Sequence, residues 1–248
     1  MESVLEVCAA SLASVKAAAQ GGATRIELCS ALSEGGVTPS AGLISMARKV
    51  EGVKLHVLIR PRGGDFVYDA AETECMMADI RMAAECGADG VVIGALRCDG
   101  SVDEDVCRAM VDAAKGMSIT FHRAFDLCRE QAEALERVIA LGCHRLLTSG
   151  GAASAFEGSQ RIAELNRQAA GRIVIMPGAG VTAANAAEIL RLTGCHEIHA
   201  SAREKADSVM AYRHHGVAMG AAGSDEFVRL ETSQRAVAEI LDAINRLP

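Results

Sequence analysis

Two short apolar segments near the start of the chain each contain a carboxylate followed two residues later by a thiol. Glu6 precedes Cys8, and Glu27 precedes Cys29. Residues two apart lie on the same face of a β-strand, so each glutamate is expected to share a face with its cysteine. If both faces point into a barrel, two carboxylates and two thiols line adjacent strands near its mouth.

These four residues admit a functional and a structural interpretation. A carboxylate inside a strand is costly to bury unless it is paired, so Glu6 and Glu27 are either catalytic candidates or partners of a structural arginine. Cys8 and Cys29 are either groups of the mouth or ordinary core residues, because free cysteine behaves as a small hydrophobic side chain. Both alternatives stay open on the sequence alone.

A third apolar segment runs into a glycine-rich loop that carries two arginines. Arg60 and Arg62 precede a pair of glycines. Guanidinium groups grip carboxylates and phosphates through paired hydrogen bonds, so this loop is typical of an anion site. Alternatively, Arg60 neutralises Glu27 or Glu6, and the two roles are compatible.

His122 ends another apolar segment and is followed by Arg123 and Asp126. A histidine in that place is a candidate general base or metal ligand. A lone histidine is more often structural, but its charged neighbours favour a functional interpretation. We therefore include His122 and Asp126 among the catalytic candidates, with Glu6, Glu27 and Arg60.

Glycine-rich turns follow the later apolar segments, and glycine lets a backbone approach an anion closely. Tight turns also need glycine without any ligand, so this signal is moderate. The residues predicted to bind a ligand are Arg62, Arg123, Ser149, Gly178, Gly180, His199 and Ser201.

These candidates need elements that place them together. Eight short segments rich in Val, Ile and Leu are predicted as buried parallel strands, and Ala-rich segments of helical period separate them. The predicted strands are 4–8, 25–29, 54–60, 90–94, 118–122, 145–148, 172–176 and 197–200. The predicted helices are 11–20, 39–50, 70–86, 103–115, 128–141, 155–170, 182–192 and 225–247.

This alternation predicts an α/β protein, a closed parallel (β/α)₈ TIM barrel formed by residues 1–248 as one domain. Active sites of this fold lie at the C-terminal ends of the strands, where the candidates fall. An open Rossmann-like sheet is the alternative, but no GxGxxG motif follows the first strand. The long segment 201–224 is expected to be functional or contact-forming, and His214 and His215 within it could close over the site.

Composition limits the function classes. A net charge of -7 gives no general attraction to nucleic acid. Nine cysteines, an odd number without a CxxC pair, indicate reduced thiols and a cytoplasmic protein. No signal peptide or membrane span is expected.

Six blocks of the sequence together resemble the CutC copper-homeostasis family. They are residues 5–8, 21–30, 59–66, 120–126, 147–150 and 198–202, and the resemblance runs from about Leu5 to Gly220. Thr24 stands where the family usually has aspartate. The resemblance implies a (β/α)₈ barrel, a cytosolic location, a homodimer or homotetramer, and Cu(I) bound by Cys8 and Cys29. Thiolates are soft donors that suit Cu(I).

Three functions remain open. The chain could bind Cu(I) through its two cysteines and so serve copper homeostasis. It could instead be an enzyme for a small anionic or phosphorylated substrate, with phosphodiester hydrolysis as one variant, because a copper carrier does not need so many charged residues at one mouth. It could also sense a metabolite without converting it.

Overall fold

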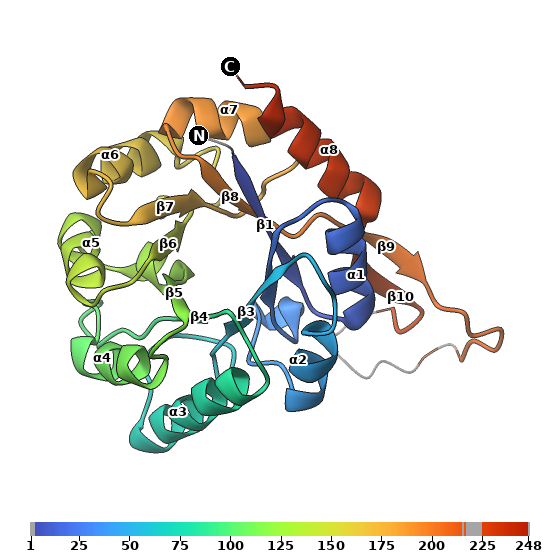
Figure 1. Ribbon diagram of the computed structural model, residues 1–248, viewed down its shortest axis with the longest axis horizontal. Coiled ribbons are helices and arrows are strands. Elements are labelled where there is room, and N and C mark those ends of the chain that lie inside the picture. The colour runs from blue at the N-terminus through green and yellow to red at the C-terminus, as the bar shows by residue number, and fades with distance from the viewer. Residues whose placement is uncertain (1–2, 215, 217–224, 248) are drawn as a thin grey trace.

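Eight parallel strands surrounded by eight helices make up the computed structural model, which describes residues 3–214, 216 and 225–247 (Figure 1). The barrel strands are β1 (Val4–Ala9), β2 (Arg25–Leu28), β3 (Lys54–Leu58), β4 (Gly90–Ile93), β5 (Ser118–Phe121), β6 (Arg145–Thr148), β7 (Val174–Pro177) and β8 (Glu197–Ala200). The helices are α1 (Leu12–Gln20), α2 (Ala41–Ala47), α3 (Ala70–Glu85), α4 (Glu104–Ala113), α5 (Gln131–Ala140), α6 (Ser159–Ala169), α7 (Ala186–Thr193) and α8 (Gln234–Asn245).

The strands follow the order β7-β6-β5-β4-β3-β2-β1-β8, and β7 and β8 meet at a seam that nearly closes the barrel. The prediction of a (β/α)₈ barrel is confirmed. Closure brings the first strand beside the last, with Glu6 in register with His199. On the other side of β1, Cys8 is in register with Glu27. This pairing gathers the polar residues of three strands at one place.

Side-chain alternation along each strand separates two environments. The outward residues, such as Leu5, Val7 and Ile26, are buried against the helices in the main apolar core. The inward residues are largely polar or charged. Two inward glycines, Gly90 in β4 and Gly94 directly after it, make room for these polar side chains. A Cβ on Gly90 would lie 2.7 Å from the His56 ring, and a Cβ on Gly94 would lie 2.5 Å from the His122 ring.

The C-terminal part of the chain departs from the prediction of one helix over 225–247. Residues 228–232 form β10 (Val228–Thr232), which pairs antiparallel with β9 (Arg203–Asp207). Helix α8 starts only after Ser233, whose hydroxyl accepts a hydrogen bond from the N–H of Ala236. The prediction is wrong for its first residues because strand pairing with a distant segment overrides local helical preference.

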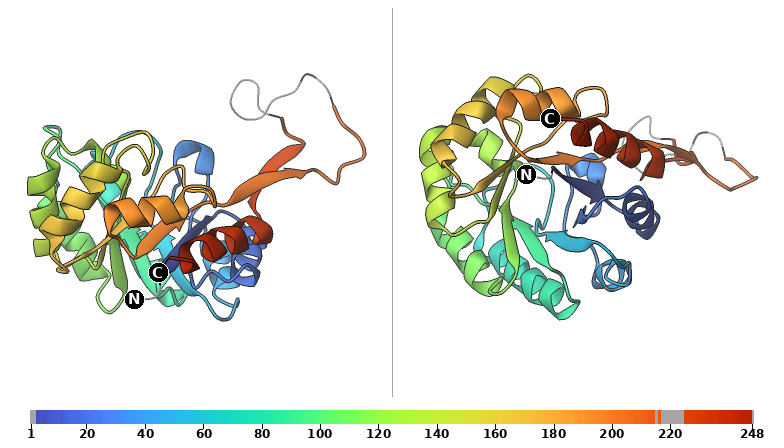
Figure 2. Two further views of the ribbon diagram at one scale, coloured as in Figure 1. Left: turned by 90° about the horizontal axis from the view of Figure 1, so that it is seen from above. Right: turned by 45° about the horizontal axis from the view of Figure 1, so that its top comes forward.

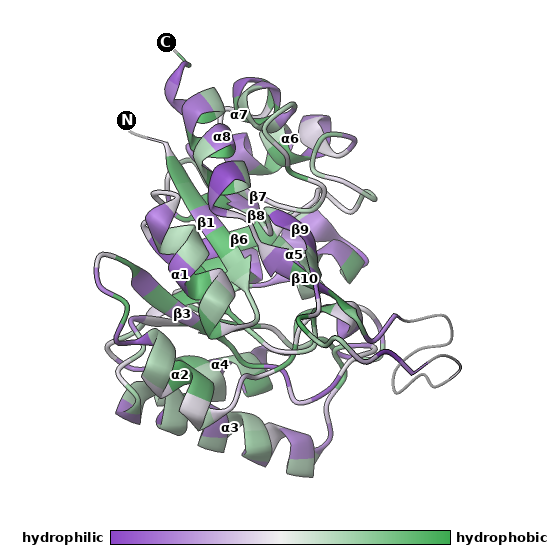
Figure 3. Ribbon diagram, turned by 90° about the vertical axis from the view of Figure 1, so that its right-hand side faces the viewer, coloured by the Kyte–Doolittle hydropathy of each residue, from purple (hydrophilic) through white to green (hydrophobic). Residues whose placement is uncertain are grey.

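The two strands form a ribbon that projects beyond the barrel (Figure 2), and β9 is largely hydrophilic (Figure 3). Ser11 and Ser14 of the α1 region donate hydrogen bonds to Glu231, which ties the base of the ribbon to the barrel. The segment 201–224 therefore contains strand β9, while His215 and residues 217–224 lie outside the described part. None of the described helices is both long and apolar enough to cross a membrane.

Candidate functional site

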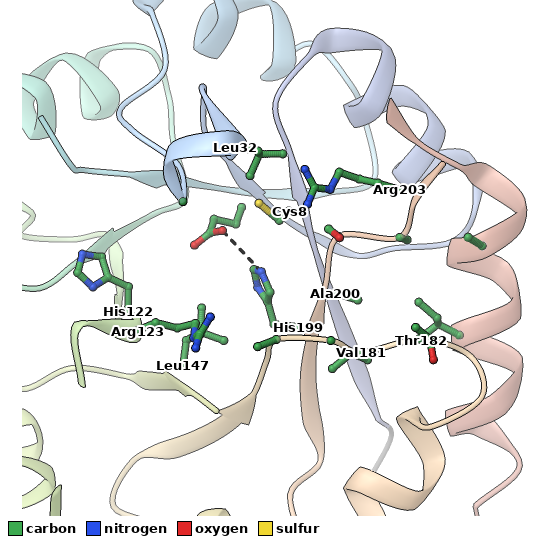
Figure 4. A pocket seen from close by; sticks show the side chains of 18 of the residues that line it. Cys8, Leu32, His122, Arg123, Leu147, Val181, Thr182, His199, Ala200 and Arg203 are labelled. Atoms are coloured by element: carbon green, nitrogen blue, oxygen red, sulfur yellow. Dashed lines mark ion pairs between the residues drawn. The ribbon is translucent and has the colours of Figure 1, made fainter. Parts of the chain in front are cut away.

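A cavity of about 730 Å³ opens at the C-terminal ends of the barrel strands (Figure 4). It extends from the barrel interior to the loops after β7 and β8 and to one side of α8. Among the residues singled out in the sequence, those that line it are Cys8, Glu27, Arg60, His122, Arg123, Gly180, His199 and Ser201. The structure therefore brings together residues that come from six different strands or the loops that follow them.

Beneath the cavity lies a buried ionic layer centred on Arg25. Its Nε donates to Glu6 Oε2 at 2.6 Å, and its Nη2 donates to Glu197. Glu197 also accepts from Arg145 Nε at 2.8 Å. Arg25, Glu6 and Glu197 are all buried, so the charges compensate one another out of contact with water.

His199 connects this layer to the cavity. Its Nδ1 lies 2.9 Å from Glu6 Oε1, and its Nε2 lies 3.7 Å from Glu27 Oε2, the ion pair drawn in Figure 4. Glu6 thus holds one ring nitrogen while the other faces Glu27 at the cavity surface. A carboxylate that orients a histidine in this way fixes which nitrogen faces the reacting groups.

The surroundings shift the proton affinities of these three groups in different directions. Burial raises the pKa of Glu6, but the His199 hydrogen bond and the Arg25 charge outweigh it and leave the pKa below its ordinary value. Burial also raises the pKa of Glu27, and there it prevails over the attraction of His199. Burial lowers the pKa of His199, but the Glu27 charge and hydrogen bonds with Cys8 and Glu6 raise it well above its usual value.

Such an arrangement is suited to acid–base chemistry. Neighbouring groups whose pKa values are displaced by their environment are typical of catalytic acids and bases. The raised pKa of His199 favours its protonated form, which can donate, while Glu27, with its raised pKa, is the stronger base of the two glutamates. Both line the cavity, so a bound molecule could exchange a proton with either.

Cys8 and Cys29 lie next to each other, with their Sγ atoms 3.6 Å apart. Cys8 lines the cavity, whereas Cys29 is fully buried behind it and packs with Leu58 and Val92. The Cys29 contact, burial and the charge of Glu27 all raise the pKa of Cys8 well above its usual value. The Cys8 thiol is therefore protonated in this environment, and a metal would have to displace its proton.

Two overlapping sets of donors at the mouth could hold a metal ion. The two sulfur atoms suit a soft ion such as Cu(I). Cys8, Glu27 and His199 form a second set, whose ligand atoms all lie within 4.8 Å of one another. Mixed sulfur, oxygen and nitrogen donors are typical of Zn²⁺ rather than Cu(I).

Arg60 and His122 form another wall of the cavity. Arg60 donates to the carbonyl oxygens of Glu34, Gly36 and Gly64, so it braces the loops and does not pair with Glu27 or Glu6 as the sequence allowed. The His122 ring contacts the Phe66 ring, with centroids 4.9 Å apart and the two planes tilted by 47°. Burial, and next the charge of Arg60, lower the pKa of His122 to about 3, so its imidazole is neutral.

Asp126 lies outside the cavity lining and fastens two loops together. Its carboxylate accepts hydrogen bonds from Thr148 Oγ1 at 2.5 Å, Ser149 Oγ at 2.9 Å and Arg123 Nε at 2.7 Å. The Gly151 N–H also donates to it, at 3.2 Å. These partners occupy the carboxylate, so Asp126 and Ser149 shape the mouth indirectly.

Four more candidates lie around the cavity without lining it. Arg62 pairs with Glu72, its Nε 2.5 Å from Glu72 Oε1. Gly178 donates its N–H to the carbonyl of Thr148, and Glu6 and Cys29 lie behind the cavity surface, as described above. None of these four residues belongs to the cavity lining.

Sequence reasoning overlooked Arg25, Glu197 and Arg145 as inward charges. Arg25 lies two residues before Glu27, and Glu197 two residues before His199. The same period-two argument that paired Glu27 with Cys29 would have placed both on the inward face. Arg203, which lines the mouth from β9, carried no such signal because the ribbon was not predicted.

Comparisons with known proteins agree with the fold and point to one family. The sequence model of the CutC family matches residues 3–204. A family protein CutC from Chromobacterium violaceum is 52% identical over 246 residues, which cover 99% of this chain and 100% of that protein.

Among solved structures, one is similar in both sequence and fold, and another is similar in fold alone. A CutC protein from Streptococcus agalactiae, described in connection with copper homeostasis, is 34% identical with a TM-score of 0.77, covering 80% of this chain and 98% of its own. Thiamine phosphate pyrophosphorylase from Pyrococcus furiosus is 16% identical with a TM-score of 0.60, covering 97% of this chain and 95% of its own. The second similarity shows the fold alone.

Proposed function

The chain belongs to the CutC family, and we propose that its barrel mouth is the active site of an enzyme that moves a proton on a small anionic substrate. Glu27 is the general base and His199 the general acid. The observation that carries this proposal is the buried Glu6–His199–Glu27 line, which ends in a cavity large enough for a metabolite.

Each member of this line has a separate task. Glu6, held by Arg25, fixes the His199 ring through Nδ1. His199 then presents Nε2 to the cavity as a proton donor. Glu27 accepts a proton from the substrate, and its raised pKa brings its proton affinity closer to that of a carbon or hydroxyl acid. A metal carrier needs no such graded set of proton affinities.

The proposal is tested by finding ligands and then following proton exchange. A library of carboxylated and phosphorylated metabolites is screened by thermal shift, and each hit is incubated in D₂O with the protein while NMR records deuterium incorporation. We expect Glu27→Gln to bind the hit and to slow exchange by about 10²–10⁴-fold, the usual contribution of one general base. Glu157→Gln, an exposed carboxylate outside the cavity, is the matched control.

Two results would contradict this function. A library in which no metabolite raises the melting temperature removes the evidence for a small-molecule site. Exchange that proceeds equally in the Glu27→Gln and Glu157→Gln variants removes Glu27 as the base.

A second function, Cu(I) binding for copper homeostasis, is favoured by one observation. The Sγ atoms of Cys8 and Cys29 are 3.6 Å apart at the mouth, which suits one soft ion held between two sulfurs. The reduced protein is titrated anaerobically with Cu(I) against a competing chelator, beside the Cys8→Ser/Cys29→Ser double variant. One tight site that disappears in the variant supports this function, and equal binding in both proteins excludes it. Cys75→Ser/Cys98→Ser, which changes two exposed thiols, is the control.

A further inference from the structure

The loop between β7 and α7 lines the cavity with main-chain N–H groups that have no partner. The N–H groups of Ala179, Gly180, Val181, Ala183 and Ala184 donate no hydrogen bond to any described residue. All five residues belong to the cavity lining. Backbone N–H groups are strong donors, so those that no described residue accepts are open to a bound ligand or to water.

The loop backbone takes a left-handed conformation at two successive residues. Ala179 and Gly180 both have positive φ, 86° and 67°, and the Ala155 N–H holds the Ala179 carbonyl from the opposite side at 3.0 Å. Successive N–H groups in a turn of this kind form a concave site for anions. Ala183 and Ala184 precede α7, where the helix dipole adds positive potential.

A guanidinium group lies over the same mouth. Arg203 reaches from β9 toward Cys8 and Leu32 (Figure 4), and it has no carboxylate partner among residues 3–214, 216 and 225–247. Glu204 and Glu239 also line this part of the cavity. Arg235 pairs with both of them, so their charges leave that of Arg203 uncancelled.

The opposite wall of the cavity gives an independent observation, since it also carries polar groups without partners among the described residues. Arg60 Nε and His122 Nε2 are buried and have no hydrogen-bond partner in the described part of the chain, and both residues line the cavity. The residues are only 6% and 5% exposed, so water does not readily satisfy them. Leaving buried donors unpaired is costly, and such groups at a cavity surface are typical of ligand sites.

From these contacts we propose that the β7–α7 loop and Arg203 bind the phosphate group of a small phosphate ester. The rest of the molecule extends past His199 and Glu27 toward Arg60 and His122. A phosphate monoester has three free oxygens and up to two negative charges, which suit a row of N–H donors and a guanidinium better than the two oxygens of a carboxylate do. This inference rests on the proposed function, since it names the class of substrate for that site.

The test uses inorganic phosphate as the probe and the full chain as the protein. A ¹⁵N–¹H NMR titration follows the amides of residues 179–184 in the unaltered chain and in two variants. Arg203→Gln removes the guanidinium. Ala183→Pro removes one N–H at the second position of the turn that Thr182 and Asn185 close, where proline is favoured. Arg229→Gln, on the neighbouring strand β10 and outside the cavity, is the control.

We expect saturable shifts at these amides, an affinity about tenfold weaker in Arg203→Gln and in Ala183→Pro, and no change in Arg229→Gln. Acetate at the same concentrations should produce smaller shifts. Melting temperatures show whether Ala183→Pro folds. If it does not fold, the phosphate affinity of Arg203→Gln relative to the unaltered chain tests the inference.

Three results would overturn the inference. Absence of saturable shifts excludes the site, and equal affinity in Arg203→Gln and the unaltered chain indicates an adventitious ion only. Acetate that binds as tightly as phosphate excludes the phosphate assignment. Glu27→Gln should still bind phosphate, because Glu27 is not part of the proposed phosphate site. The phosphate titration therefore tests this inference even if the proton-transfer proposal fails.

Discussion

The barrel interior contains two polar layers that differ in how their charges are paired. In the lower layer, Arg25 joins Glu6 to Glu197, and Glu197 also pairs with Arg145. In the mouth layer above it, Glu27 lies 3.7 Å from His199 and next to the Cys8 thiol, with no arginine or lysine paired to it among the described residues. Arg60 and His122 each keep one nitrogen to which no described residue is hydrogen-bonded.

This difference in pairing suits the lower layer to supporting the barrel and the mouth layer to binding a ligand. Buried charges that satisfy one another hold strands in place, and nothing more can bind to them. Buried polar groups that stay incompletely satisfied are expensive, and a folded protein keeps them where a ligand completes them. His199 belongs to both layers, because Glu6 holds one side of its ring and the cavity meets the other.

The largest effect is expected from breaking the lower layer. Arg25→Met leaves Glu6 and Glu197 without their shared partner, and removing one partner of a buried ion pair costs about 3–5 kcal/mol. Urea unfolding should show that loss in the free energy of unfolding. Arg172→Met, which removes an exposed pair with Glu136, should have little effect. If the two variants lose equal stability, the lower layer is not the support described here.

An intermediate effect is expected from crowding the mouth. A Cβ on Gly94 would lie 2.5 Å from His122 Cε1, so Gly94→Ala must displace the imidazole from its contact with the Phe66 ring. Overpacking of this kind costs about 1–3 kcal/mol. Gly42→Ala, in helix α2 and without a close neighbour, should be neutral or slightly stabilising. Thermal unfolding compares the two, and an unchanged Gly94→Ala protein would show that His122 is not confined.

The smallest effect, taken per pH unit, concerns the pH dependence of stability. The pKa of His122 is lowered to about 3 by burial and by Arg60, so between about pH 6 and pH 3 the unfolded chain binds a proton that the folded chain does not. Stability is therefore present above the unfolded pKa and is lost as the pH falls through this range. His122→Gln should reduce the slope by about 1.4 kcal/mol per pH unit.

This slope is measured by urea unfolding at several pH values. His56, whose pKa burial lowers to about 4, contributes a similar slope that should remain in the variant. His214→Gln, an exposed histidine, is the control. A slope that is the same in His122→Gln and the unaltered chain would mean that His122 is protonated in the folded state.

Much of the architecture could be predicted from the sequence. Short apolar runs separated by capped helical segments predicted all eight barrel strands, and the signature around Glu6, Cys8, Glu27 and Cys29 resembled the family that the comparisons then showed. These features are local, since strand period, helix caps and turn glycines are encoded within a few residues.

The tertiary structure alone decided which residues pair with one another across the chain. Arg25 meets Glu197 across 172 positions of sequence because barrel closure places β8 beside β1. Residues 228–232 form a strand and not a helix because they pair with residues 203–207. Asp126 accepts hydrogen bonds from the loop after β6 and does not line the cavity. The sequence determined which face of its strand each side chain occupies. The arrangement of the strands around the barrel determined which side chains of different strands meet, and therefore which charges of the mouth are paired and which polar groups are not.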